Sequence, residues 1–305
     1  MKTTKPDFFD DFCCLAQNCK HNCCKEGWQI DIDAKTLQKY EQSQNKIFAD
    51  VSQKIVQDGN GGHCIKLDKD KKCPYLLDDG LCGIAVHCGN KFLSDVCRDY
   101  PRFYNFLPDK TEVGLGLGCE EVARIVLSHK EKITFVSDSK AKSKFGTEDK
   151  NFQQICETFQ NRNFSFFERV KQVALSQKID LDKIFAVTKN FEKFEWLNFD
   201  FSKYDYSNFC IKELQCLQNF QAENLSVNFL YRYFSNKKYR FLPQTKVAFA
   251  IFGTMFVDEF LSQNHMDSTQ ENQIFVTTNF SKEFEYSFEN MTKALDFLQK
   301  TATKQ

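Results

Sequence analysis

Residues 13–28 read CCLAQNCKHNCCKEGW, which places five cysteines within sixteen positions and ends on a tryptophan. Two pairs, Cys13 with Cys14 and Cys23 with Cys24, are adjacent in the sequence. Adjacent cysteines rarely bond to each other, so each pair needs partners elsewhere. The stretch therefore predicts a site that distant parts of the chain complete.

Cysteine, glycine and proline divide the chain near residue 120. Eleven of the fourteen cysteines, ten of the twelve glycines and four of the five prolines lie before that point. The remainder has few breakers and repeats apolar residues at helical spacing. One such face is formed by Phe152, Ile155, Cys156 and Phe159. We predict a mainly α protein, with a cysteine-rich metal-binding head that has little β structure and an α-helical body after it.

The polar stretch SDSKAKSKFGTEDKN separates the two parts. The predicted divisions are a cysteine-rich metal-cluster domain over 1–128, a linker or exposed loop over 129–150, and an α-helical domain over 151–305. Within the head, WQIDI alternates like a short strand, and Asp33 is expected to cap a helix that carries Tyr40 and Val51.

Composition also limits the class of protein. Lysine plus arginine and aspartate plus glutamate balance at 41 each, and the absence of a basic tract argues against a nucleic-acid partner. The most apolar run, VAFAIFGTMFV, is too short to span a membrane. The first residues show no apolar signal segment, so we expect a cytoplasmic protein with reduced thiols that bind metal or carry out redox chemistry.

The cysteines of the head fall into two groups by spacing. They are Cys14, Cys19 and Cys23, and then Cys73, Cys82, Cys88 and Cys97. Four thiolates complete either a tetrahedral zinc site or an iron–sulfur cluster. The C-x2-C pairs of zinc ribbons are absent, and a cysteine–proline step such as Cys73–Pro74 also occurs in ferredoxins.

Any single cysteine can instead be a small buried apolar side chain. That alternative stays open for Cys13, Cys64, Cys88 and Cys119. It is the expectation for the three cysteines of the body, which are Cys156, Cys210 and Cys216.

Four motifs follow one another in the first part of the chain. They are FCCLAQNCKHNCCKEGWQIDID from Phe12, CPYLLDDGLCGI from Cys73, CRDYPRF from Cys97 and CEEVARIVL from Cys119. Their order and spacing resemble the flagellin lysine-N-methylase family, over about a third of the chain. This chain departs from the family pattern in its extra cysteines (Cys13, Cys64, Cys88) and in Glu120, where the family pattern has proline.

The resemblance implies a function. Members of that family carry an iron–sulfur cluster in a cysteine-rich region and methylate lysine side chains of flagellin with S-adenosylmethionine. It implies a 4Fe-4S cluster, S-adenosylmethionine as cofactor and flagellin as partner; the oligomeric state stays open. The implied metal ligands are Cys14, Cys19, Cys23, Cys24, Cys73, Cys82 and Cys97.

A broader resemblance gives an alternative. Zinc- or iron-chelating cysteine-cluster domains share the CC pair, a later C-P-[FY]-L, an LC and a C-R-x-[FY]-P. These proteins often have no assigned activity. The alternative function is a non-catalytic metal-binding protein.

Methyl transfer to lysine sets requirements on the site. The amine must lose its proton, although the reference pKa of lysine is about 10.4. An aromatic face attracts cations, so Trp28 is a candidate catalytic residue, with a core position as its structural alternative. Asp99 and Tyr100 are candidate proton acceptors, and Arg98 or Arg102 could bind the carboxylate of the cofactor. Local salt bridges and helix capping are the alternatives for Arg98, Asp99 and Arg102.

Radical enzymes that use S-adenosylmethionine show C-x3-C-x2-C, whereas Cys19, Cys23 and Cys24 give C-x3-C-C. Polar methyl transfer is therefore preferred. The glycine-rich segment VGLGLGCEEVARIVL at 113–127 lacks the G-x-G-x-x-G spacing and a following βαβ pattern. We interpret it as a turn before a helix that starts after Cys119.

Overall fold

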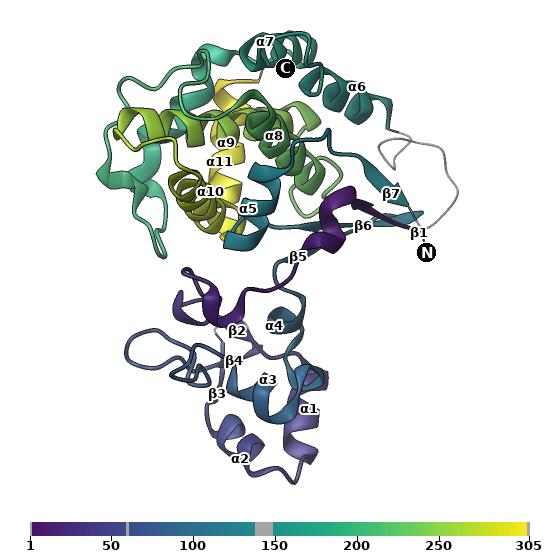
Figure 1. The fold of residues 1–305 in the computed structure, drawn as a ribbon, viewed down its shortest axis with the longest axis vertical. Helices are drawn as coiled ribbons and strands as arrows, with labels where there is room; N and C mark the ends of the chain where they lie inside the picture. Colours follow the sequence, from purple (N-terminus) through teal and green to yellow (C-terminus); the bar gives the residue numbers. More distant parts are fainter. Residues whose placement is uncertain (1, 59–60, 138–148, 304–305) are drawn as a thin grey trace. The chain divides into compact units, whose positions relative to one another are not determined.

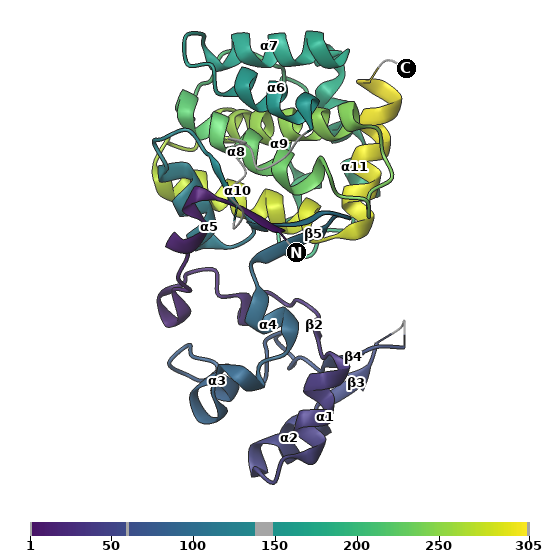
Figure 2. The same cartoon turned by 90° about the vertical axis from the view of Figure 1, so that its right-hand side faces the viewer.

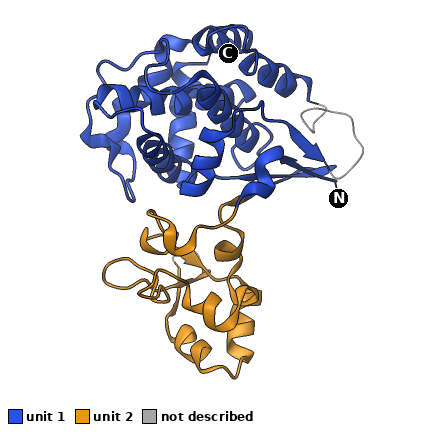
Figure 3. Ribbon diagram, viewed as in Figure 1, with its two compact units in different colours: residues 1–12, 103–305 blue, residues 13–102 orange. Residues whose placement is uncertain are grey.

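The computed structural model of the chain describes residues 2–58, 61–137 and 149–303 (Figure 1). It is mainly α-helical, as predicted. Two compact units make up the chain: unit 2 comprises 13–102, and unit 1 comprises 1–12 and 103–305 (Figure 3). Residues 1–12 and 103–128, which the sequence assigned to the head, thus share a unit with the helical body. Ten of the fourteen cysteines lie in unit 2.

Unit 1 combines a small sheet with a helical core. Its strands are β1 (Lys2–Pro6), β5 (Arg102–Phe106, beginning at the unit boundary), β6 (Lys110–Leu115) and β7 (Phe135–Ser137). Their order is β5-β6-β1-β7, with β1 parallel to β6 and antiparallel to β7. The segments that carry β1 and β6 belong to unit 1, because the two strands pair with each other and because Phe8 and Leu115 join the core of the helices.

Most helices of unit 1 follow the strands in sequence, except that η1 comes directly after β1 and α5 comes before β7. The α-helices are α5 (Glu120–Ser128), α6 (Lys150–Phe159), α7 (Phe166–Gln177), α8 (Asn219–Tyr233), α9 (Pro243–Gln263), α10 (Gln270–Glu285) and α11 (Phe288–Thr301). The 3-10 segments are η1 (Asp7–Asp11), η5 (Leu181–Lys193) and η6 (Phe201–Lys203). Figure 2 shows α6 and α7 packed against each other at one end of the unit.

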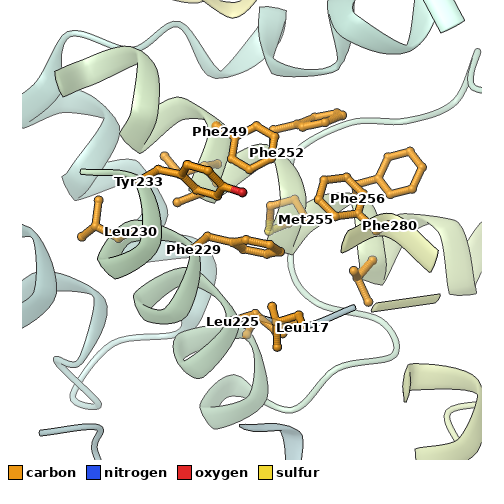
Figure 4. Close-up of a cluster of buried hydrophobic side chains, with 14 of the residues drawn as sticks. Leu117, Leu225, Phe229, Leu230, Tyr233, Phe249, Phe252, Met255, Phe256 and Phe280 are labelled. Carbon is orange, nitrogen blue, oxygen red and sulfur yellow. The ribbon is translucent and has the colours of Figure 1, made fainter. Parts of the chain in front are cut away.

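The core of unit 1 is dense with phenylalanine. Helix α9 is buried from Thr245 to Leu261, so it carries apolar residues all round. Figure 4 shows Phe229, Phe249 and Phe280 meeting at this core. The aromatic richness of the body therefore serves packing.

Several sequence expectations for helices are confirmed. The predicted face of α6 is buried at all four positions. Helix α5 begins after Cys119. A Ser165 capping box starts α7 at Phe166, which is buried, whereas Phe167 is half-buried.

The glycine-rich segment forms the end of β6 and the turn to α5, as interpreted. A side chain at Gly114 would overlap the ring of Phe103, and one at Gly116 would overlap Tyr286 and Arg232. The glycines are therefore needed for close packing against large side chains.

Unit 2 is built from short elements around a small core. They are η2 (Ala16–Asn18), η3 (Cys23–Lys25), β2 (Ile30–Asp31), α1 (Ala34–Gln42), α2 (Lys46–Gln53), β3 (Ile55–Gln57), β4 (His63–Ile65), α3 (Gly83–Cys88), η4 (Asn90–Phe92) and α4 (Asp95–Asp99). The strands form an antiparallel sheet in the order β2-β4-β3. Asp33 caps α1 as predicted, but Tyr40 and Val51 lie on two helices, because Asn45 caps a new one.

The predicted linker over 129–150 contains β7 and the start of α6, and its residues 138–148 lie outside the described residues. Among the helices of the described residues, none has the length and apolar character needed to cross a membrane.

Candidate cysteine site

The first cysteine segment is fixed by a side-chain cap. Asn22 caps η3 by accepting a hydrogen bond from the backbone N–H of Cys24 at 2.9 Å. The amide Nδ2 of the same residue donates to the carbonyl of Gly80 at 3.2 Å. Asn22 therefore ties the Cys23–Cys24 pair to the turn that contains Gly80.

The second cysteine segment is a tight turn over residues 73–83. Leu77 N–H donates to Leu81 O at 2.9 Å, and Leu76 and Cys82 form an antiparallel bridge. Cys73 N–H donates to the carbonyl of Cys24 at 2.9 Å. The turn thus carries Cys73 and Cys82 to the segment that holds Cys24.

Helix α4 carries Cys97 and is held by α1. The Asp33 carboxylate accepts from Asp95 N–H at 2.9 Å while it also accepts from Thr36 N–H at 3.0 Å. The Tyr40 hydroxyl donates to the carbonyl of Phe92, just before α4, at 2.6 Å. One carboxylate therefore fixes the starts of both helices.

Three thiols in this region interact through their side chains. The pKa of Cys24 lies above its usual value, because its side chain hydrogen-bonds with Cys23 and with Cys73 and because burial adds to the effect. The hydrogen bond from Cys24 lowers the pKa of Cys73 to about 7, although burial opposes this. The three sulfur atoms therefore form one hydrogen-bonded group.

Two further thiols lie within electrostatic reach of this group. Burial raises the pKa of Cys82, and Cys73 and Cys23 contribute. Burial also raises the pKa of Cys97 to about 12, and the charges of Cys23, Cys73 and Cys82 add to it. Cys97 as a residue is exposed to solvent, although its thiol lies close enough to other protein atoms for burial to affect its pKa.

The structure thus brings together five of the seven predicted ligands, which we call the thiol cluster: Cys23, Cys24, Cys73, Cys82 and Cys97. Cysteine thiolates are ligands of iron–sulfur clusters and of zinc, so the chemistry of these five side chains suits either kind of metal site. As the side chains stand, no group of three or more His, Cys, Asp or Glu residues in the described part of the chain could hold a metal ion.

The other two predicted ligands take local positions. Cys14 is exposed, and its Sγ accepts from the backbone N–H of Ala16 at 3.4 Å. Cys19 is half-buried after η2, where its own N–H donates to Ala16 O at 3.2 Å.

The remaining cysteines differ in their surroundings. Cys64 lies in β4, and Cys88 ends α3, where its sulfur accepts from Asn45 Nδ2 at 3.6 Å. Cys119 precedes α5 in unit 1. Of the three cysteines of the body, Cys156 is fully buried in α6, as expected for an apolar residue, and Cys216 is half-buried. Cys210 is exposed, so the expectation of a buried apolar side chain is wrong there.

Trp28 and Tyr100 pack together in unit 2. Their ring centroids are 4.9 Å apart and their planes meet at 87°, which is an edge-to-face contact. Both residues are half-buried. The pair therefore offers an aromatic surface that is still partly open to solvent.

The polar candidates of the CRDYPRF motif are joined to one another. Arg98 forms ion pairs with Asp95 at 2.6 Å and with Asp99 at 3.0 Å. Asp99 first, and then Asp95, raise the pKa of the Arg98 guanidinium. Arg102 is half-buried at the start of β5. The local salt bridge, which was the alternative interpretation, describes Arg98 and Asp99 as they stand.

Sequence reasoning missed a surface hollow in unit 2. It has a volume of about 380 Å³ and is lined by Lys46, Ile47, Asp50, Pro74, Tyr75, Leu77, Gly83 and His87. Its wall includes Pro74 and Gly83, which directly follow Cys73 and Cys82 in the sequence. A sequence signal for it was absent, because α2, the 73–83 turn and α3 meet only in the folded unit.

Fold and site define a class: a mainly α-helical protein with a separate small unit in which thiols gather. Comparison of the sequence gives the family. The chain is 31% identical over 149 residues to proteins named lysine-N-methylase from Salmonella choleraesuis and Salmonella typhimurium. It is 34% identical over 130 residues, 76% of that protein, to the flagellar biosynthetic protein FliU of Salmonella muenchen. The chain belongs to the family of these lysine-N-methylase and FliU proteins.

The matches cover part of each molecule. The lysine-N-methylase matches span 47% of this chain and 37% of each of those relatives, and the FliU match spans 41% of this chain. No family model matches the chain, and no solved structure matches it.

Proposed function

We propose that this protein is a protein lysine N-methyltransferase that acts on flagellin with S-adenosylmethionine as methyl donor. The observation that carries the proposal is the 31% identity to proteins named lysine-N-methylase. The flagellar name of the third relative supports flagellin as the substrate. Reduced thiols in unit 2 suit a cytoplasmic enzyme.

The proposal includes a 4Fe-4S cluster in unit 2. The five thiols of the thiol cluster are the proposed ligands, with Cys14 and Cys19 as further candidates. Their support is the contact of Cys24 with Cys23 and Cys73 and the nearness of the other two sulfurs. We assign the cluster a structural or orienting role.

The proposed chemistry is a polar displacement. S-adenosylmethionine supplies a methyl group on a positively charged sulfur. The lysine nitrogen forms a bond to that methyl carbon as the carbon–sulfur bond breaks, and the nitrogen loses a proton. Trp28 and Tyr100 would hold the lysine against an aromatic surface, and Tyr100 or Asp99 would accept the proton. Arg98 and Arg102 are the motif's candidates for binding the cofactor's carboxylate.

The test uses anaerobically purified protein, S-adenosylmethionine and flagellin, with formation of S-adenosylhomocysteine as the measurement. The proposal expects product only when both protein and flagellin are present. Product that forms at the same rate without flagellin would contradict the substrate, and no product with iron-loaded protein would contradict the activity.

A second candidate is a non-catalytic zinc- or iron-binding protein. The gathering of thiols in unit 2 favours it equally, because metal binding alone needs no further residues. Metal analysis and an absorption spectrum separate the candidates. About four irons per chain and a visible thiolate–iron absorption support the proposed enzyme; a colourless protein with stoichiometric zinc supports the second candidate.

A further inference from the structure

Ser94 immediately precedes helix α4 and is its N-cap residue. The N–H of Arg98 donates to the carbonyl of Ser94 at 2.9 Å, as the first backbone hydrogen bond of a helix does. A serine at this position usually turns its hydroxyl to the N–H of the second or third helical residue. Here the third helical residue is Cys97, and the Ser94 side chain makes no capping hydrogen bond.

A residue of another helix takes the capping role. Asp33 Oδ2 accepts from Asp95 N–H at 2.9 Å, so the carboxylate at the start of α1 satisfies the first N–H of α4. The hydroxyl of Ser94 is not needed there, although the residue is only 2% exposed and its oxygen is buried without a conventional hydrogen-bond partner. Native proteins rarely bury a hydroxyl in this state, because an unpaired polar group costs free energy, so each case has a specific cause.

The thiol of Cys97 supplies that cause. Burial, the largest effect, raises the pKa of this thiol, and a side-chain contact with the hydroxyl of Ser94 opposes the rise. With the neutral thiol the contact falls short of ordinary hydrogen-bond geometry. A thiolate carries a full negative charge and is the stronger acceptor, and it is also the form in which cysteine binds a metal.

A second hydroxyl near Cys97 is already occupied. Tyr40 lies within electrostatic reach of Cys97 and Cys82, but its hydroxyl donates to the carbonyl of Phe92 at 2.6 Å. Tyr40 therefore has no hydroxyl proton left for a sulfur atom. Of these two hydroxyls, that of Ser94 is the one with a proton to donate.

We propose that Ser94 is a positioning residue of the thiol cluster, whose hydroxyl donates a hydrogen bond to the sulfur of Cys97 when that sulfur binds the metal. The inference rests on the iron–sulfur cluster of the proposed function and goes beyond it, because it names a residue that tunes the cluster. A hydrogen bond to a ligating sulfur withdraws electron density and stabilises the more negative, reduced state of an iron–sulfur cluster. The Ser94 hydroxyl therefore raises the reduction potential.

The test is a redox titration of the anaerobically purified, iron-loaded protein, followed by absorbance and electron paramagnetic resonance, and it needs no turnover. Ser94→Ala should keep the iron and shift the reduction potential to a more negative value. Ser94→Gly also lacks the hydroxyl and should give the same shift. Because glycine is well tolerated at an N-cap, this second variant covers a loss of folding in the first.

Two further variants separate the hydroxyl from general effects. Ser94→Thr retains a hydroxyl and should keep the potential close to that of the unaltered protein. Ser52→Ala makes the same change at a half-buried position of α2 and should leave the potential where it is.

The inference is overturned if the potential stays the same in Ser94→Ala and Ser94→Gly, or if Ser52→Ala or Ser94→Thr shifts it as much as Ser94→Ala does. An iron–sulfur cluster whose potential does not respond to the Ser94 variants refutes the inference alone. If metal analysis finds no iron in the unaltered protein, the proposed cluster fails and the inference fails with it.

Discussion

Single residues explain why the sulfurs of unit 2 gather. Asn22 caps the turn that carries Cys24 and also reaches Gly80, and the N–H of Cys73 completes the link at the carbonyl of Cys24. The predicted ligand set came from spacing and resemblance alone. Neither shows that Asn22 joins the two segments, because the role of an asparagine becomes visible only when its partners are placed.

At the residue scale, replacing one member of the thiol cluster tests its role in metal binding. Cys24→Ser and Cys73→Ser should each lower the iron content of anaerobically purified protein, because a hydroxyl is a poor ligand for iron–sulfur clusters. Metal analysis with an absorption spectrum gives the measurement.

The control for that experiment is Cys156→Ser, which alters a cysteine buried in α6 of unit 1. It should keep the full iron content once the folded fraction is taken into account. Equal iron loss in all three variants would show that the effect comes from general instability.

At the scale of elements, the sequence predicted where helices lie better than it predicted which elements pair with one another. Asp33 as a cap and the buried face of α6 follow from local patterns and are confirmed. The split of the first helix at Asn45 and the parallel pairing of β1 with β6 were missed. Parallel partners are far apart in sequence, so no local pattern reveals them.

Asp33→Ala should destabilise unit 2 by about 1–2 kcal/mol, because it removes the cap of α1 and the acceptor for Asp95 N–H. Urea unfolding measures the loss, with the exposed Asp78→Ala as control. Hydrogen bonds hold the pKa of Asp33 below its usual value despite desolvation. The stabilisation is therefore present above about pH 4 and is lost as the pH falls further. An equal loss in both variants would contradict this role.

Gly114→Ala should lower the melting temperature of unit 1, because the new methyl group overlaps the ring of Phe103. Overpacking of this kind costs about 1–3 kcal/mol. Val136→Ala, at a half-exposed position of β7 in the same sheet, is the control and should change stability less. An unchanged melting temperature for Gly114→Ala would show that Phe103 moves aside freely.

At the scale of the whole molecule, the predicted division of the chain followed composition, whereas the structure follows packing. Most cysteines and breakers lie before residue 120, but Phe8, Leu117 and Val122 are buried in the core of the helical unit. Composition records which residue types a segment contains. It does not record which core those residues join, and this is why the small sheet went unforeseen.

Two tyrosines of unit 1, the buried Tyr239 and the half-buried Tyr286, predict how stability depends on alkaline pH. Burial raises the pKa of Tyr239 and of Tyr286 to about 12, above the reference value of about 10. The folded state keeps these protons longer than the unfolded state, so stability is full below about pH 10 and falls between about pH 10 and 12. Circular dichroism and tyrosinate absorbance should change together. Tyrosinate signal from all tyrosines before any loss of helix would contradict the prediction.

The most direct measurement of the central claim is peptide mapping of flagellin by mass spectrometry. Flagellin is incubated with the anaerobically purified protein and S-adenosylmethionine that carries a deuterated methyl group. The account predicts deuterated methyl groups on lysine side chains, strongly reduced with Trp28→Ala. Flagellin lysines that stay unmodified with an iron-loaded, folded protein would contradict it.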